Sequence, residues 1–179
     1  MALTRMSDAF GDFVDAADAV EVDVHRVDAA EFQEYLTELL ETPAVGVSLD
    51  DAFDADGVEL AETPVAVDPT PAALEAATTG VTPAALGVAD YGSVVLRTSA
   101  AGSELVSLFV EHHVAVVRAT DIQPSMRDAL SALDDEFAET RGSAIVATGP
   151  SATADMGALV RGAHGPRDVD VIVVEGESA

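Results

Sequence analysis

The sequence predicts an α/β domain in which a mostly parallel sheet is flanked by helices and accompanied by a small antiparallel part. One observation is that strand patterns alternate with helix patterns at both ends of the chain. Another is a group of short strand patterns in the middle, which is typical of a meander. The chain of 179 residues also contains no repeat and no low-complexity linker, so we expect a single domain over residues 1–179.

Helical spacing of apolar residues predicts two helices near the start of the chain. The first lies within residues 1–20, where the spacing involves Met6, Phe10, Phe13, Val14 and Ala17. The second has one apolar face made of Phe32, Leu36, Leu39 and Leu40. Asp28 precedes Glu31 by three positions, which is a capping-box arrangement for the second helix, and Pro43 stops it.

Two further helices begin beside prolines. Pro71 occupies the first helical position after Thr70, and this helix is expected to end near Gly80. The last helix starts near Ser125 and carries apolar residues at helical spacing, namely Met126, Ala129, Leu130, Leu133 and Phe137.

Strands are predicted where β-branched and other apolar residues cluster. They cover residues 20–27, 44–49, 64–67, 94–98, 105–110, 114–117, 144–148 and 169–174. Thr82-Pro83 and residues 100–103 are predicted as turns, and residues 50–63 as an acidic loop region.

Composition indicates a globular protein, since 49% of the residues are apolar. No apolar run approaches the length of a membrane span, so we expect no membrane insertion. The first residues lack a basic segment followed by an apolar one, which predicts no signal peptide and a cytoplasmic location.

Cysteine is absent, which excludes disulfides, cysteine-ligated iron–sulfur clusters and a thiol nucleophile. The sequence also lacks a Gly-x-Gly-x-x-Gly motif, a Walker A loop and a Gly-x-Ser-x-Gly elbow. Nucleotide binding and a serine triad therefore have no direct support, and no cofactor is predicted.

The charge is strongly acidic, with 33 Asp and Glu against 8 basic residues and a net charge of −25. A partner-binding acidic surface is one interpretation. Because the acids are spread along the whole chain, adaptation to a cytoplasm at molar salt is the interpretation we adopt. Phosphate neutralisation needs a basic surface, so the composition argues against nucleic acid as a partner.

Residues 149–174 contain the most informative pattern. Gly149 and Pro150 follow a predicted strand, and Ser151, Thr153 and Asp155 come next, before a run that predicts a short helix. Free N–H groups at a helix start, at the carboxyl end of a sheet, can hold a carboxylate or phosphate. The alternative is a capped helix without a ligand.

His164 lies in a Gly-Ala-His-Gly-Pro turn before the last predicted strand. Its imidazole can point into a cleft as a base or hydrogen-bond donor, or it can serve only to hold the turn. His164 and Asp155 are the candidate catalytic residues.

Asp90 and Ser93 precede another predicted strand. We expect Asp90 to cap its own loop through backbone N–H groups, or else to line the pocket. Ser93 is a candidate donor to a ligand.

The adjacent His112 and His113 point to opposite faces of a strand, which makes a poor chelate. A metal site would need His25, His164 or carboxylates brought in by the fold, so we predict no metal.

The run Gly-Pro-Ser-Ala-Thr-Ala-Asp at 149–155, followed by Gly-Ala-His-Gly-Pro at 162–166 and an apolar strand, resembles the C-terminal signature of the LUD (lactate utilization) domain family, LutC type. Residues 87–92 resemble the family's Gly-x-Ala-Asp-x-Gly segment, and His113 matches a family histidine that precedes an apolar strand. Where the family commonly has Glu after this signature, the chain has Gly157, so a role for that Glu is not carried over.

The resemblance implies the NagB/RpiA/CoA-transferase-like fold and participation in oxidising L-lactate to pyruvate beside an iron–sulfur subunit and a cysteine-rich subunit. It leads to a hypothesis of a non-redox accessory component that binds a small carboxylate or phosphate-bearing ligand. The ligand-binding residues would be Gly149, Ser151, Thr153, Asp155, His164, Asp90, Ser93 and His113. The alternatives are a stand-alone CoA-transferase-like or sugar-phosphate-isomerase-like enzyme, and a homo-oligomer with a vestigial pocket.

Overall fold

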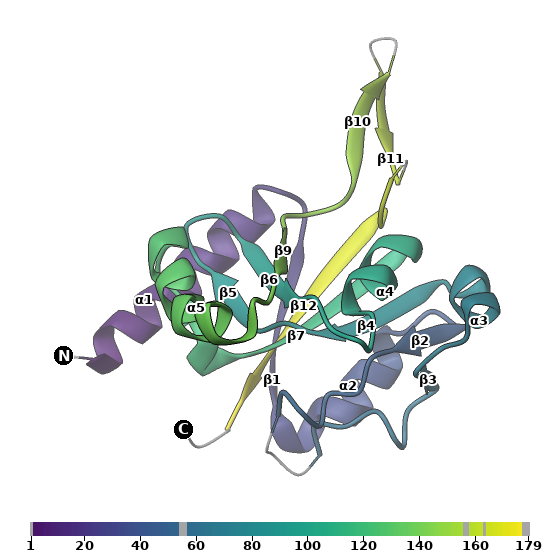
Figure 1. Cartoon of the computed structure of the whole chain (residues 1–179), viewed down its shortest axis with the longest axis horizontal. Coiled ribbons are helices and arrows are strands. Elements are labelled where there is room, and N and C mark those ends of the chain that lie inside the picture. Colours follow the sequence, from purple (N-terminus) through teal and green to yellow (C-terminus); the bar gives the residue numbers. More distant parts are fainter. Residues whose placement is uncertain (1, 54–56, 156–157, 163, 177–179) are drawn as a thin grey trace.

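The computed structural model describes residues 2–53, 57–155, 158–162 and 164–176, without the side chains of residues 2–8, 135, 153–155 and 158–160. Its centre is a six-stranded sheet with the order β1-β12-β7-β4-β2-β3 (Figure 1). The strands are β1 (Asp23–Asp28), β12 (Asp168–Glu175), β7 (His112–Arg118), β4 (Thr79–Pro83), β2 (Ala44–Gly46) and β3 (Val65–Val67). All neighbouring strands pair in parallel, which confirms the α/β class.

A second, four-stranded sheet has the order β8-β5-β6-β9. Its strands are β8 (Ile122–Gln123), β5 (Leu86–Val88), β6 (Ser93–Arg97) and β9 (Ala144–Ala147). β6 pairs antiparallel with both β5 and β9, whereas β5 and β8 are parallel. A small, partly antiparallel sheet is thus present as expected, but of its strands only β6 and β9 coincide with predicted strands, and the predicted strand at 114–117 belongs to β7 of the parallel sheet.

The helices are α1 (Ala2–Asp18), α2 (Phe32–Leu39), α3 (Pro71–Ala76), α4 (Ser103–Phe109) and α5 (Met126–Thr140). The hydroxyls of Thr70 and Ser125 cap α3 and α5 by accepting from the N–H groups of Ala73 and Asp128. The predicted capping box before α2 does not form, because a short 3₁₀ turn intervenes and Asp28 makes no side-chain cap bond. Within the described residues, no helix has both the length and the apolar character that crossing a membrane requires.

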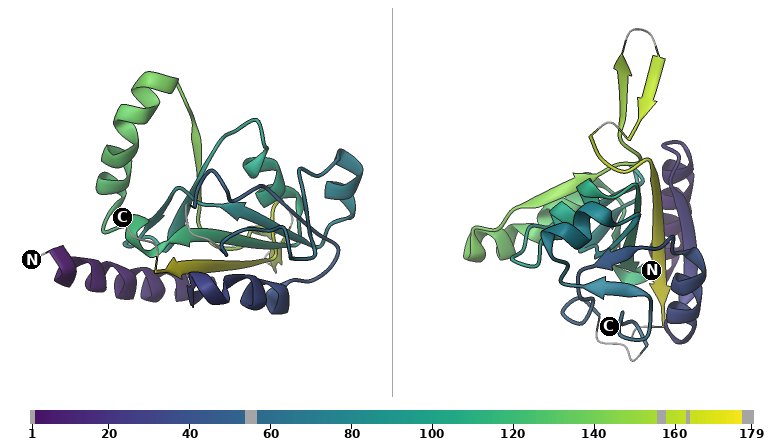
Figure 2. Two further views of the ribbon diagram at one scale, coloured as in Figure 1. Left: turned by 90° about the horizontal axis from the view of Figure 1, so that it is seen from below. Right: turned by 90° about the vertical axis from the view of Figure 1, so that its right-hand side faces the viewer.

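Successive side chains of the central strands point to opposite faces of the parallel sheet, so the core is divided between these two faces. Ala115 and Val117 of β7 face a cluster that includes Phe13 of α1 and Leu96 of β6. Val114 and Val116 face the cluster that contains Phe32 and Leu36 of α2. Figure 2 shows that α5 stands apart from the central sheet. It packs instead on β5 and β6 of the smaller sheet, through Ala129 and Leu133.

β4 lies where the sequence predicts a helix end and then a turn at Thr82-Pro83. The apolar pattern of β4 is weak because two of its buried positions are threonines. The hydroxyls of Thr79 and Thr82 are hydrogen-bonded, to the Glu41 carbonyl oxygen and to the His113 ring. Gly80 leaves room for α4, since a Cβ there would lie 2.8 Å from Cγ1 of Val106. Pro83 is the last residue of the strand, where a missing N–H is tolerated.

The predicted strand at residues 105–110 is wrong, because most of this run belongs to α4. Gly102, with a φ of 78°, turns the chain into the helix. Val106 and Val110 are buried, while Leu105, Leu108 and Phe109 remain exposed. A short apolar run of this kind fits a strand and a half-buried helix equally well.

The predicted helix after Pro150 is also wrong. The chain forms an antiparallel hairpin of β10 (Ala152–Asp155) and β11 (Ala158–Arg161), in which Thr153 opposes Val160. The hairpin projects from the rest of the molecule (Figures 1 and 2).

Candidate functional site

The chain leaves the body of the molecule at Ser151 and returns at Gly162. The Ser151 N–H donates to the Pro166 carbonyl oxygen, and the Gly162 N–H donates to the Ser151 carbonyl oxygen, each at 2.8 Å. Gly149 precedes this crossing with a φ of 63°, and a Cβ there would lie 2.5 Å from the carbonyl oxygen of Val20. Glycine is therefore required at the turn that directs the chain to the base of the hairpin.

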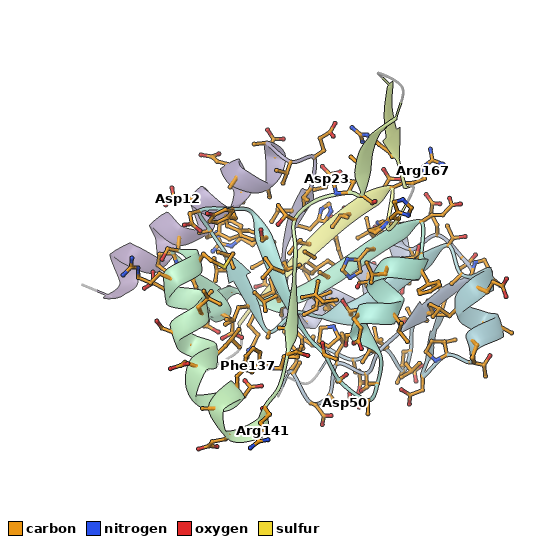
Figure 3. The ribbon with its side chains drawn as sticks, turned by 45° about the horizontal axis from the view of Figure 1, so that its top comes forward. Asp12, Asp23, Asp50, Phe137, Arg141 and Arg167 are labelled. Atoms are coloured by element: carbon orange, nitrogen blue, oxygen red, sulfur yellow. The ribbon has the colours of Figure 1, made fainter. Side chains whose placement is uncertain are left out.

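This crossing and the end of α4 border a hollow of about 460 Å³, which we call the stem hollow. Its lining residues are Leu108, Phe109, Val110, Glu111, Gly162, His164, Gly165 and Arg167. The His164 N–H donates to Ser151 Oγ at 3.4 Å, which brings these two predicted residues together. Figure 3 shows Arg167 beside the base of the hairpin.

Arg167 gives the stem hollow a permanent positive charge that the sequence prediction did not include. Its backbone N–H donates to the carbonyl oxygen of Glu111 at 2.7 Å, which fixes its position at the start of β12. In the described part of the chain, the Arg167 guanidinium forms no ion pair, although the Glu111 side chain also lines the hollow. A free guanidinium can bind a carboxylate or phosphate through two parallel hydrogen bonds.

The stem hollow lies at the amino edge of the parallel sheet, where β7 and β12 begin. The expected location at the carboxyl edge, beside a helix start, is therefore wrong. Since a hairpin replaces that helix, any anion here would be held by side chains and not by free N–H groups of a helix.

Thr153 and Asp155 are described only by their backbones, which lie in β10. Their side chains, including the carboxylate of the catalytic candidate Asp155, lie outside the described part of the structure. Four residues of extended strand separate Asp155 from Ser151, which places its backbone about 13 Å away along the hairpin.

Asp90 and Ser93 are not brought to the stem hollow. Asp90 Oδ1 accepts the Met126 N–H at 3.1 Å, so it contacts the start of α5 and not its own loop. Ser93 is fully buried, and its hydroxyl pairs with Thr148 Oγ1 at 2.6 Å. Both positions join segments of the smaller sheet and α5.

His113 is also remote from a ligand site, because its ring is buried and pairs with Thr82 Oγ1 at 2.8 Å. Burial, with a smaller contribution from the neighbouring His112, lowers the pKa of His113 to about 4. The imidazole is therefore neutral at physiological pH. His112 points to the other face of the strand, as the alternation predicts.

A hydrogen-bonded polar cluster on that other face was missed by sequence reasoning. His112 Nε2 donates to Asp170 Oδ2 at 2.5 Å, and His25 Nε2 donates to the other oxygen, Oδ1. The Tyr35 hydroxyl donates to His25 Nδ1 at 2.7 Å, and Thr79 Oγ1 lies 3.3 Å from His112 Nδ1. The cluster thus links α2 to four strands of the parallel sheet.

Asp170 is the centre of this cluster. Burial alone would raise its pKa, but the hydrogen bonds from His112 and His25 lower that pKa to about 2. The carboxylate is therefore ionised and accepts from both rings. In the described residues, no group of three or more His, Cys, Asp or Glu side chains is arranged to hold a metal ion.

The LUD domain family model matches residues 11–174, so the chain belongs to the LUD domain family. A crystal structure of a DUF162 family protein from Deinococcus radiodurans has the same fold. The TM-score is 0.73 at 22% sequence identity, over 95% of this chain and 98% of that one.

Within this family, the chain is similar to several proteins named lactate utilization protein C. It is 30% identical over 105 residues to the one from Oceanobacillus iheyensis, covering 56% of this chain and 45% of the relative. The identity is 33% over 105 residues for Deinococcus radiodurans, covering 58% and 49%. For Bacillus licheniformis it is 36% over 107 residues, covering 56% and 44%. The matched region thus spans about half the length of each relative.

Proposed function

We propose that the protein is a non-redox accessory component of L-lactate oxidation to pyruvate. It would bind a small carboxylate or phosphate-bearing ligand in the stem hollow. The observation that carries this proposal is that Arg167 and His164 line a space of about 460 Å³, while Ser151 accepts a hydrogen bond from the His164 N–H. The similarity to proteins named for lactate utilization supports the process, and the lack of cysteine supports a role without electron transfer.

The ligand would be held by charge and hydrogen bonds together. Arg167 would bind the anionic group, and the exposed His164 imidazole would donate to it or accept a proton from it. Leu108 and Phe109 would contact the apolar part of the ligand. Because the molecule as a whole is strongly acidic, this local positive charge is what would attract an anion.

Partner subunits belong to the same proposal. The iron–sulfur and cysteine-rich components would dock near the mouth of the stem hollow, where Leu105, Leu108 and Phe109 of α4 are exposed. Exposed apolar side chains gathered in one place are typical of protein contact surfaces. We also propose that the protein resides in a salt-rich cytoplasm and that its fold is of the NagB/RpiA/CoA-transferase-like type.

Ligand-induced thermal stabilisation in about 1 M KCl, where charge repulsion is screened, tests the site. L-lactate, pyruvate and inorganic phosphate are the probes. A probe at 100 times its dissociation constant should stabilise the folded state by about 2.7 kcal/mol. Arg167→Gln should weaken binding about tenfold or more, since a charge-assisted contact is lost.

Arg127→Gln is the matched control, because Arg127 is an exposed arginine of α5 that does not line the hollow. The control should bind like the unmodified chain. Equal affinities of the two variants, or no stabilisation by any probe, would contradict the proposed site. A pull-down at the same salt concentration tests the partners, and failure to recover iron–sulfur proteins would contradict that part.

A further inference from the structure

A second hollow, of about 440 Å³, lies at the opposite edge of the parallel sheet, and we call it the carboxyl-edge hollow. It is lined by Val47, Ser48, Asp51, Ala52, Pro83, Ala84, Ala85, Arg97, Ser99, Ala100, Ala101 and Ser103. Asp50, next to the lining residue Asp51, and Arg167 of the stem hollow lie far apart in Figure 3. Neither the sequence motifs nor the proposed function involves this hollow.

The topology of the sheet places this hollow where α/β proteins bind ligands. β2 and β4 are neighbours, and residues directly after each strand line the hollow. The next strand of this sheet after β2 is β3, which lies on the side of β2 away from β4. The next strand of this sheet after β4 is β7, which lies on the side of β4 away from β2. A crevice therefore opens between the carboxyl ends of two strands whose connections diverge, as the rule for open α/β sheets describes.

Ser103 contributes a hydroxyl to the wall of this hollow. Its side chain is only 4% exposed, yet within the described residues its hydroxyl has no hydrogen-bond partner. By contrast, Ser107 on the same helix is equally buried and donates to the Glu104 carbonyl oxygen at 2.9 Å. Since Ser103 lines the hollow and its Oγ is not among the fully enclosed atoms that lack a partner, this hydroxyl is open to the hollow and available to a bound molecule.

Arg97 lies at the end of β6 with one edge of its guanidinium already engaged. Nε and Nη2 donate to the Glu136 carboxylate at 2.8–3.1 Å, which holds the side chain against α5. In the part of the chain that the structure describes, Nη1 has no acceptor. This nitrogen and the Ser103 hydroxyl can therefore both donate to one carboxylate of a ligand.

Asp51 adds an acceptor on another wall. It lies on an exposed turn between Leu49 and Phe53, whose buried side chains anchor the turn in the core. Its carboxylate repels a simple anion but accepts from a hydroxyl or ammonium group. The remaining lining is small and aliphatic, so the hollow suits a short molecule and offers no aromatic surface for stacking a base.

We propose that the carboxyl-edge hollow binds a short carboxylic acid that carries a hydrogen-bond donor on the carbon next to the carboxylate. The carboxylate contacts Arg97 and Ser103, and the hydroxyl or ammonium of the adjacent carbon donates to Asp51. This site is separate from the stem hollow and does not depend on the function proposed there.

Four three-carbon acids test the requirement for the donor: L-lactate, L-alanine, pyruvate and propionate. They share the carboxylate and differ in the substituent on the next carbon. Titration into the full-length ¹⁵N-labelled chain in about 1 M KCl should shift the amide signals of Ser99 and Ser103. L-lactate or L-alanine, whichever donor fits, should bind about tenfold more tightly than pyruvate and propionate. Equal binding of all four acids would overturn the proposal.

Two pairs of variants assign the contacts. Ser103→Ala should raise the dissociation constant about fivefold or more, whereas Ser107→Ala should leave it unchanged. Asp51→Ala should remove the preference for a donor, and Asp50→Ala, which changes a neighbouring acid outside the lining, should preserve it. Because Asp51 is exposed, its variant keeps the test valid even if Ser103→Ala unfolds the chain. Equal behaviour within both pairs would overturn the assignment.

The same spectra separate the two sites. Signals of His164 and Arg167 report on the stem hollow, and signals of Ser99 and Ser103 report on the carboxyl-edge hollow. Shifts confined to His164 and Arg167 would contradict this inference while supporting the proposed function. Shifts confined to Ser99 and Ser103 would have the opposite meaning.

Discussion

Two adjacent histidines of β7 have opposite environments. His112 donates to the ionised Asp170, whereas His113 is buried and hydrogen-bonded to the neutral hydroxyl of Thr82. The buried ring of His113 resists protonation, and its pKa of about 4 lies below the ordinary value of 6.5 for histidine. In the unfolded chain the same ring takes up a proton near its ordinary pKa. Proton uptake therefore favours unfolding as the pH falls through this interval.

The resulting prediction concerns stability between pH 6.5 and about pH 4. Since the unfolded state binds the proton and the folded state does not, His113 should lower the unfolding free energy by about 3 kcal/mol across this interval. Above it, both states are neutral and the effect disappears. His113→Gln, which retains a donor toward Thr82, should reduce the pH dependence by this amount in urea unfolding at fixed KCl. Parallel curves for His113→Gln and the unmodified chain would contradict the assignment.

Single residues also show where sequence reasoning reaches its limit. Ser151 and His164 lie within hydrogen-bond distance because both belong to one short segment, although Ser151 does not line the hollow. Asp90 and Ser93 have the residue types of a binding site, but their hydrogen bonds are made to α5 and Thr148. Asp170 meets its two histidines only through the register of three strands distant in sequence. Residue type alone does not supply that register.

At the scale of elements, patterns with one consistent period were predicted correctly. Helices α1, α2 and α5 follow the 3.6-residue spacing of their apolar positions, and β12 follows from a continuous apolar run. The errors fall on short segments: α4, β4 and the β10–β11 hairpin. In α4 the apolar residues surround most of the helix, in β4 threonines replace apolar residues, and the hairpin pairs only with itself. Periodicity cannot separate helix from strand in such segments.

Gly149 forms the turn that directs the chain to the base of the hairpin and so positions the stem hollow. The substitution Gly149→Ala tests whether this turn requires glycine. The substitution forces a β-carbon into a left-handed backbone and within 2.5 Å of the Val20 carbonyl oxygen. Gly102→Ala is the matched control, because its φ is also positive but its nearest neighbouring atom is 3.7 Å away. We expect a loss of about 1 kcal/mol for the control and at least about 2 kcal/mol for Gly149→Ala in urea unfolding. Equal losses would show that the Val20 contact is unimportant.

Over the whole molecule, negative charges far outnumber positive ones. A net charge of −25 on 179 residues means that carboxylates repel one another over most of the surface. Side chains with red oxygen tips extend around the whole molecule in Figure 3. α1 is a local example, since Asp12, Asp15 and Asp18 are exposed and no basic residue occupies its last turn. The acids near that end also oppose the negative pole of the helix dipole.

This repulsion should make the stability of the protein depend on salt. Raising KCl from about 0.1 M to about 1 M shortens the Debye length from about 10 Å to about 3 Å, so the thermal midpoint should rise. Salt also strengthens apolar burial, and a variant separates the two contributions. Substituting Asp12, Asp15 and Asp18 of α1 by Lys should raise the midpoint most at low salt and make its salt dependence shallower. The effect of salt on apolar burial is the same in the variant and in the unmodified chain. If the thermal midpoint of the variant rises with salt as steeply as that of the unmodified chain, charge repulsion is not the cause of the salt dependence.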